Sequence, residues 1–291
     1  MKKQTRVWLV VSIALSLAAL GSACSKTPEP VNDGGGAATA AKYTGPTGTV
    51  TGVVSFNGTA PAPTKIDSTA DPVCGKQNPN LETEITVVKD GKLANAFVYI
   101  KDGTTTDGKK VGDFTWDTPT AAAQLDQNGC HYRPHVLGVQ TNQKISITNS
   151  DPTTHNIHPT PKQNPEWNQS QPSGAAPIEK SFARSEILVP VKCNQHPWMK
   201  AYIGVMKTPF FAVSADNGSF TIKGVPAGTY TVAAWHEGGV DGTTKTVQVT
   251  VPANGSATAD FAFEGAATSA NQQGGLKMMP AIEFPMLGRK H

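Results

Sequence analysis

The stretch DNGSFTIKGVPAGTYTVAAWHEG, residues 216–238, decides the fold class. Residues 219–222 and 229–236 alternate between apolar and polar side chains, which is typical of half-buried β-strands. Asp-Asn-Gly precedes the first of these segments, and a Gly-Val-Pro-Ala-Gly run separates the two. Gly, Pro, Asn and Asp supply the backbone conformations that tight turns need. The stretch therefore predicts two strands joined by a turn.

The same pattern continues outward in both directions. The chain has 291 residues with 28 Gly and 22 Pro, and 16% of it is charged, which favours short strands and turns over long helices. We find no convincing helical stripe between residues 48 and 264, so we expect an all-β protein built of sandwiches. Further strands are expected at residues 49–56, 84–88, 95–100, 136–139, 144–148, 187–191, 201–205, 246–251 and 257–263.

The G-x-F-x-I-x-G-x-P-x-G-x-Y run within residues 216–238 resembles the carboxypeptidase-regulatory-like module, a small Ig- or transthyretin-like sandwich. The resemblance covers about residues 210–264 and implies a smaller sandwich over residues 209–264. It carries no peptidase residues, and such modules serve as linkers, supports or binding domains, so a carbohydrate ligand is possible. The opening strand, residues 48–58, has a similar pattern and could pair with either unit.

The N-terminus reads as a targeting segment. Three basic residues precede an apolar stretch over residues 7–20, and small residues lead to Cys24. This order predicts a secretory signal peptide over residues 1–23, and the stretch is too short to span a bilayer comfortably. The end of the signal resembles that of bacterial lipoproteins, which implies that Cys24 is lipidated. The alternative is an ordinary cleaved signal with an incidental cysteine.

The flanking segments and the net charge fit a protein held outside the cytoplasm. Residues 24–47 are rich in Gly, Ala, Pro and Thr and predict a flexible tether, and residues 265–291 predict a tail. The expected location is the cell envelope, periplasmic or at the outer membrane, through a lipid anchor. The formal net charge is +3, and the signal segment carries three of the positive charges. The remainder is neutral, so nucleic acid is not an expected partner.

The string VKCNQHPWM, residues 191–199, holds candidate metal ligands. Cys193, His196 and Met199 follow a C-x2-H-x2-M spacing and offer soft to intermediate donors. Two histidines and a cysteine with a weak axial methionine form the donor set of copper electron-transfer sites. His155, 38 residues before the cysteine, supplies the second histidine directly after a predicted strand.

This part of the chain resembles the cupredoxins, the plastocyanin and amicyanin group. The C-x2-H-x2-M spacing, the proline after the histidine and the N-x-D…HN stretch at residues 149–156 carry the resemblance, which covers roughly residues 84–208. It implies a cupredoxin-like Greek-key sandwich, assigned to residues 48–208, and looks interrupted by an insertion at residues 161–178. It implies one type 1 copper bound by His155, Cys193, His196 and Met199. Asn156, beside the first histidine, would link the two ligand loops.

The resemblance implies transfer of single electrons. No metal position is left for substrate, so we expect no enzymatic activity. In cupredoxins electrons pass at the outer histidine edge, so His196, Pro197 and Trp198 would dock a redox partner such as a cytochrome c. Two other functions stay open: a non-redox envelope protein whose sandwiches bind carbohydrate or protein, and a protein of copper delivery or storage.

The four cysteines fit this reading. With Cys24 assigned to lipid and Cys193 to metal, Cys74 and Cys130 remain, and an oxidising envelope permits a disulfide between them. Such a bond would stabilise the fold by roughly 3–4 kcal/mol on a chain-entropy model. The rival pairing, Cys130 with Cys193, would abolish the copper site. Histidines 131, 135 and 158 could hold a second metal or simply lie in polar loops.

Overall fold

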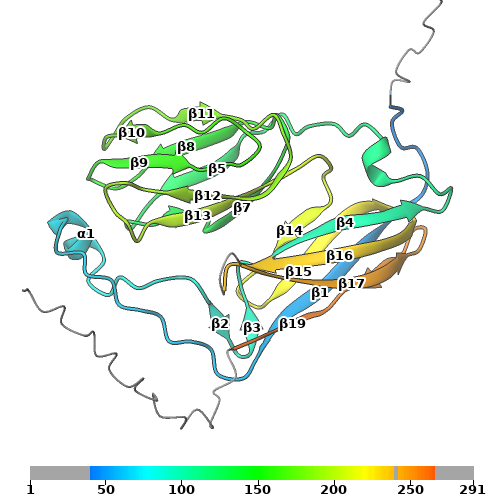
Figure 1. Ribbon diagram of the computed structural model, residues 1–291, viewed down its shortest axis with the longest axis horizontal. Coiled ribbons are helices and arrows are strands. Elements are labelled where there is room, and N and C mark those ends of the chain that lie inside the picture. The colour runs from blue at the N-terminus through cyan, green and yellow to red at the C-terminus, as the bar shows by residue number, and fades with distance from the viewer. Residues whose placement is uncertain (1–39, 239–241, 266–291) are drawn as a thin grey trace, which may run out of the picture. The chain divides into compact units, whose positions relative to one another are not determined.

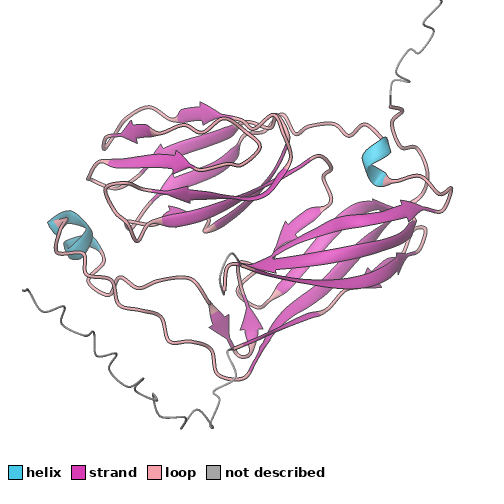
Figure 2. Cartoon of the chain, in the orientation of Figure 1, coloured by secondary structure: helices cyan, strands magenta, loops and turns pink. Residues whose placement is uncertain are grey.

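The computed structural model describes residues 40–238 and 242–265. The predicted signal peptide, Cys24, most of the tether and the predicted tail after residue 265 lie outside the described residues. The described chain is nearly all strand, with a short helix α1, Pro72–Gln77, and a 3-10 turn η1, Val111–Asp113 (Figures 1 and 2). Within these ranges, no helix has the length and apolar character needed to cross a membrane. The all-β prediction is confirmed.

The first sandwich carries the predicted ligands and consists of two sheets. One sheet has the strand order β10-β9-β12-β13-β7, and the other has the order β11-β8-β5-β6 (Figure 1). The strands are β5 Ala123–Gln127, β6 Tyr132–Arg133, β7 Val136–Gln140, β8 Ile145–Asn149, β9 His155–Pro159, β10 Gln169–Gln171, β11 Ile178–Lys180, β12 Glu186–Lys192 and β13 Lys200–Met206.

The second sandwich also has two sheets. One follows the order β15-β1-β3-β2, with β18 and β19 also paired to β1, and the other follows β14-β4-β16-β17. The strands are β1 Thr47–Asn57, β2 Val88–Lys89, β3 Lys92–Leu93, β4 Phe97–Thr105, β14 Phe211–Val213, β15 Ser219–Pro226, β16 Gly228–His236, β17 Thr243–Val251, β18 Ser256–Thr258 and β19 Phe261–Glu264.

Alternating apolar residues of these strands build two separate cores. In the first sandwich, Ile145 and Ile147 of β8 face Ile157 of β9 and Val189 of β12, and all four are almost fully buried. The second core is filled from strands far apart in the sequence, among them Val50, Phe220, Tyr230 and Phe261. Period-2 burial on β8 and β15 explains why these segments were readable as strands.

Strand pairing does not follow the predicted division at residues 208 and 209. β1 pairs antiparallel with β15 and parallel with β18 and β19, and β4 pairs with β14 and β16. The first part of the predicted 48–208 unit thus belongs to the C-terminal sandwich. The physical reason lies in Val50 and Val54 of β1, which are fully buried in the core that β15 and β19 build. Sequence proximity did not reveal these long-range partners.

Between the segments predicted as strands at residues 84–88 and 95–100, the chain forms a short hairpin. Its paired strands are β2 and β3, two residues each, while residues 84–87 are not strand. The predicted strand at residues 95–100 becomes β4, Phe97–Thr105, and its neighbours are β14 and β16. Ile85 and Val87, which carried the strand pattern, are exposed in the structure.

The first core should determine the stability of the sandwich that carries the candidate ligands. Ile147→Ala removes a side chain that is 1% exposed, so we expect the free energy of unfolding to fall by about 2–5 kcal/mol. Ile187→Ala, the matched control at a position 42% exposed, should change it by less than about 0.5 kcal/mol. Urea denaturation of both variants measures the difference, and equal losses would contradict this placement of the core.

Candidate metal centre

Three of the four predicted ligands come together through strand pairing. His155 begins β9, and Cys193 directly follows β12. β12 pairs with both β9 and β13, with Lys192 opposite His158 on one side and Lys200 on the other. The β12–β13 connection, which also holds His196 and Met199, therefore lies beside the start of β9. One donor atom from each of His155, Cys193 and His196 lies within 4.8 Å of the other two.

The donor atoms face one another at close range. The Nδ1 atoms of His155 and His196 are 2.8 Å apart, and the Cys193 Sγ lies 3.6 Å from the His196 Nδ1. The two imidazole rings meet edge to face, with centroids 4.6 Å apart. All three side chains are buried, His155 completely. Two ring nitrogens and a sulfur thus converge away from bulk water.

Backbone hydrogen bonds give the β12–β13 loop its shape. The Cys193 N–H donates to the Met199 carbonyl at 3.2 Å, and the Met199 N–H donates to the His196 carbonyl at 2.9 Å. These bonds close the turn that carries all three residues. Met199 is fully buried in the same apolar cluster as Cys193. Its side chain is therefore held inside the first sandwich.

Asn156 links the two ligand loops. Its backbone N–H lies 3.5 Å from the Cys193 Sγ, and its Oδ1 accepts the Asn194 N–H at 2.6 Å and lies 3.3 Å from the same sulfur. The Tyr132 hydroxyl donates to the Asn156 carbonyl at 2.6 Å. The residue after His155 is therefore fixed on three sides, in the position that the family resemblance implied.

Two carboxylates that the sequence reasoning did not select hold the outer edges of the imidazoles. The His155 Nε2 lies 2.8 Å from the Asp151 Oδ2, and the His196 Nε2 lies 2.9 Å from the Asp71 Oδ2. Asp151 was readable as the Asp of the N-x-D stretch, and Asp71 precedes Pro72 at a helix start, a pattern typical of an N-cap. Neither pattern by itself indicates proximity to a metal ligand.

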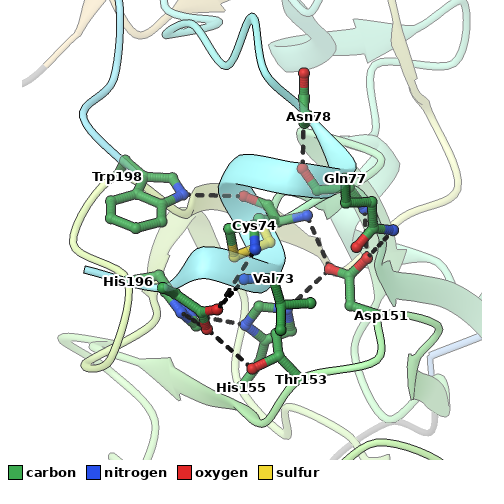
Figure 3. Close-up of a disulfide and its surroundings, with 12 residues drawn as sticks. Val73, Cys74, Gln77, Asn78, Asp151, Thr153, His155, His196 and Trp198 are labelled. Atoms are coloured by element: carbon green, nitrogen blue, oxygen red, sulfur yellow. Dashed lines mark hydrogen bonds and ion pairs between the residues drawn. A yellow bond between two sulfur atoms is a disulfide. The ribbon is translucent and has the colours of Figure 1, made fainter. Parts of the chain in front are cut away.

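The predicted disulfide between Cys74 and Cys130 is confirmed, and Cys193 is a free thiol. Figure 3 shows this disulfide beside His196, His155 and Asp151, with Cys74 supplied by α1. Two other donor groups, one of Asp71, Cys74 and His196 and one of Cys130, Asp151 and His155, share this geometry. Both depend on sulfurs that are bonded to each other, so the group with the free Cys193 is the candidate site.

Hydrogen bonds shift the pKa values of the three candidate ligands Cys193, His155 and His196. Burial raises the pKa of the Cys193 thiol, but bonds from His155, His196 and the Asn156 N–H outweigh it and lower the pKa to about 6. Burial lowers the pKa of His155, while the contacts with Asp151 and Cys193 raise it to about 9. The pKa of His196 is raised by Cys193 and Asp71 against the same burial effect. These shifts favour a thiolate on Cys193 and a proton on His155 near neutral pH.

The predicted docking residues are only partly at the surface. Pro197 is exposed and Trp198 is half-buried, whereas His196 is 3% exposed. The Trp198 Nε1 donates to the Cys130 carbonyl at 3.2 Å, and Pro197 and Trp198 line a cavity of about 90 Å³. The outer edge of His196 faces Asp71 and α1, so of the three predicted docking residues only Pro197 and Trp198 reach the surface.

The three other histidines between residues 131 and 196 each face one carboxylate. His131 lies 3.6 Å from Glu84, His135 lies 2.6 Å from Glu237, and His158 lies 2.6 Å from Glu166. None of the three shares a three-donor group in the part of the chain that the structure describes. Nor are they simply residues of polar loops, because His158 lies on β9 and His131 and His135 are buried.

Comparisons with known proteins report likeness over parts of the chain. A family model described as "Polysaccharide lyase family 4, domain II" matches residues 185–259. Among curated proteins nothing matches. The chain is similar to a purple cupredoxin from Nitrosopumilus maritimus at 20% identity and a TM-score of 0.25, covering 28% of this chain and 98% of that one.

Two further solved structures are similar at the same level. A Cu(I) form of an amicyanin variant is 17% identical with a TM-score of 0.26, covering 38% of this chain and 98% of amicyanin. A copper-containing nitrite reductase from Thermus scotoductus SA-01 is 18% identical with a TM-score of 0.27, covering 29% of this chain. The chain spans only 22% of that reductase.

The hydrogen bonds to Cys193 predict a pH titration in the metal-free protein. The ultraviolet absorbance of the thiolate should appear with a midpoint near pH 6, because the thiol pKa is lowered to about 6; below that pH the sulfur is protonated. His196→Gln removes an imidazole that stabilises the thiolate and should move the midpoint upward. His158→Gln, three residues after His155 on β9, should leave it unchanged. A wild-type midpoint near 9.0, the ordinary pKa of a cysteine thiol, would contradict the described contacts.

Proposed function

We propose that this protein is an extracytoplasmic electron-transfer protein with one type 1 copper, held at the cell envelope by a lipid on Cys24. The observation that carries the proposal is the convergence of the His155 Nδ1, the His196 Nδ1 and the Cys193 Sγ in a buried site. Met199, buried in the same loop, would supply a thioether as the fourth and weaker ligand. This donor set fits copper, because thiolate and thioether ligands favour Cu(I) while imidazole serves both oxidation states.

The contacts around the donors fit a metal that changes its oxidation state while its coordination geometry stays the same. His155 is bonded to Asp151, and Cys193 sits between the Asn156 N–H and the His196 ring. Each donor is thus held before any metal binds, and little rearrangement is needed between oxidation states. A copper ion held by His155, Cys193, His196 and Met199 would supply one-electron chemistry, with an acceptor such as a ferric cytochrome c taking up the electron to become ferrous.

A second candidate function is a non-redox envelope protein that binds carbohydrate or a protein partner. The match of residues 185–259 to a domain of polysaccharide lyases supports it in part. That match includes the loop with Cys193 and His196 as well as β15–β17 of the second sandwich. Copper delivery or storage is a third candidate, in which the same ligands would release Cu(I) readily to a chelator.

Copper loading separates these candidates. A type 1 site has an intense visible band from thiolate-to-Cu(II) charge transfer, so the oxidised, copper-loaded protein should be strongly coloured. Cys193→Ser should abolish the band, and His155→Gln should abolish or strongly weaken it. His158→Gln is the matched control, because that histidine lies on the same strand and contacts Glu166 and Asn194, and it should keep the colour.

Visible absorption and metal analysis measure the result. A wild-type protein that takes up no copper, or binds it without colour, would contradict the type 1 proposal and favour the binding function. Coloured protein in the Cys193→Ser variant would overturn the ligand assignment.

Partner docking at Pro197 and Trp198 gives a further test. Trp198→Glu places a charge on the accessible part of the ligand loop and should slow electron exchange with a small cytochrome c by about tenfold or more, a cost of ~1.4 kcal/mol in the barrier. Trp167→Glu is the control, because Trp167 is also half-buried against the same core. Stopped-flow mixing of reduced protein with the cytochrome measures the rate. Equal rates for both variants would place the docking surface elsewhere.

A further inference from the structure

The copper proposal uses Asp151 only to hold His155 and gives no role to Asp71 or to the charge of either aspartate. Each accepts a hydrogen bond from the Nε2 of one proposed ligand, Asp151 from His155 and Asp71 from His196. The side chain of Asp151 is fully buried and that of Asp71 is 17% exposed. Burying an ionised carboxylate costs free energy unless it is well hydrogen-bonded, so two such groups beside one site need an explanation.

Both carboxylates are fixed by backbone groups on their other sides. Asp151 accepts the Gly129 N–H at 2.7 Å and the Cys130 N–H at 2.8 Å. Asp71 caps α1 by accepting the Val73 N–H at 2.9 Å. These bonds hold each carboxylate oxygen in place, so each aspartate directs the ring it contacts.

The disulfide joins the two segments that fix Asp71 and Asp151. Cys74 belongs to the helix that Asp71 caps, and Cys130 donates its N–H to Asp151, so the Cys74–Cys130 bond ties together the segments that fix the two carboxylates. Gln77 of the same helix also donates to Asp151, at 2.8 Å. Figure 3 shows α1, the disulfide and Asp151 gathered over the two imidazoles. The frame around the histidines is therefore cross-linked without any metal.

This frame determines which ring nitrogen is free for a metal. An imidazole that donates its Nε2–H to a carboxylate presents the Nδ1 lone pair, and such an outer hydrogen bond also makes the ligand more basic. The two Nδ1 atoms, 2.8 Å apart, then share one proton in the metal-free protein. Metal binding must displace that proton.

The two carboxylates also set the charge around the metal. The Cys193 thiolate and two neutral imidazoles together carry one negative charge. Asp71 and Asp151 add two more negative charges, each in contact with one of the ligand imidazoles. This excess of negative charge stabilises Cu(II) relative to Cu(I).

We propose, on the basis of the copper function above, that Asp71 and Asp151 are positioning residues that present both Nδ1 atoms to the metal. Their charges lower the reduction potential of the site.

Asp71→Asn is the principal test, since Asn caps helices as well as Asp does and the variant removes the charge while keeping the first turn of α1. The copper-loaded variant should have a higher reduction potential than the wild type. Asp151→Asn should shift the potential in the same direction. Asp67→Asn is the control, because Asp67 lies on the same segment and bonds only locally, to the Thr69 N–H; its potential should not change.

A second measurement does not depend on copper. Nitrogen-15 NMR of the imidazoles in the metal-free protein should show Nε2 protonated in both His155 and His196, and Asp71→Asn should perturb the His196 Nε2 signal but not that of His155. Unchanged potentials in both aspartate variants, or an unprotonated Nε2 in the wild type, would overturn the positioning role. A wild-type protein that takes up no copper would contradict the proposed function, and the imidazole spectra would then still decide the positioning role.

Discussion

Two imidazoles and the Cys193 sulfur lie together in a small buried space. The surrounding residues supply the hydrogen bonds that offset the free-energy cost of burying these groups. A charged sulfur away from water needs hydrogen-bond donors, and Cys193 finds them in the Asn156 N–H and the neighbouring rings. Rings that carry extra protons need acceptors, and Asp71 and Asp151 supply them. The metal-free site is therefore a closed network of charges that already has the geometry of a three-donor centre.

The sandwich brings this network together with ordinary strand pairing. β12 lies between β9 and β13, so one strand aligns the loop that follows it with the residue that begins its neighbour. Loops at the end of a rigid sheet can carry the functional residues, while the core beneath them stabilises the fold. Helix α1 and the Cys74–Cys130 bond then cover the rings and replace the exposed histidine edge that the family resemblance led us to expect.

Local sequence patterns predicted the ligand loop and several strands, because these features depend on residues close together in the sequence. The C-x2-H-x2-M spacing found the ligand loop, and alternation found β8, β15 and β16, because both signals lie within a few residues. The sequence left open which unit β1 would join, so its pairing with β15 and β19 could not be assigned, and the approach of Asp71 to His196 was not predictable. Each joins residues more than a hundred positions apart, and neither leaves a mark on the neighbouring sequence. Ile85 and Val87 misled the strand assignment because their β-propensity is not used for burial.

The most direct measurement of the central claim is X-ray absorption at the copper edge of the loaded wild-type protein. The account predicts one short sulfur contact from Cys193 and two imidazole nitrogens from His155 and His196, with the same nearest neighbours in the oxidised and reduced forms. A first shell of oxygen and nitrogen without sulfur would contradict it, because copper would then be bound away from the site that the two loops build.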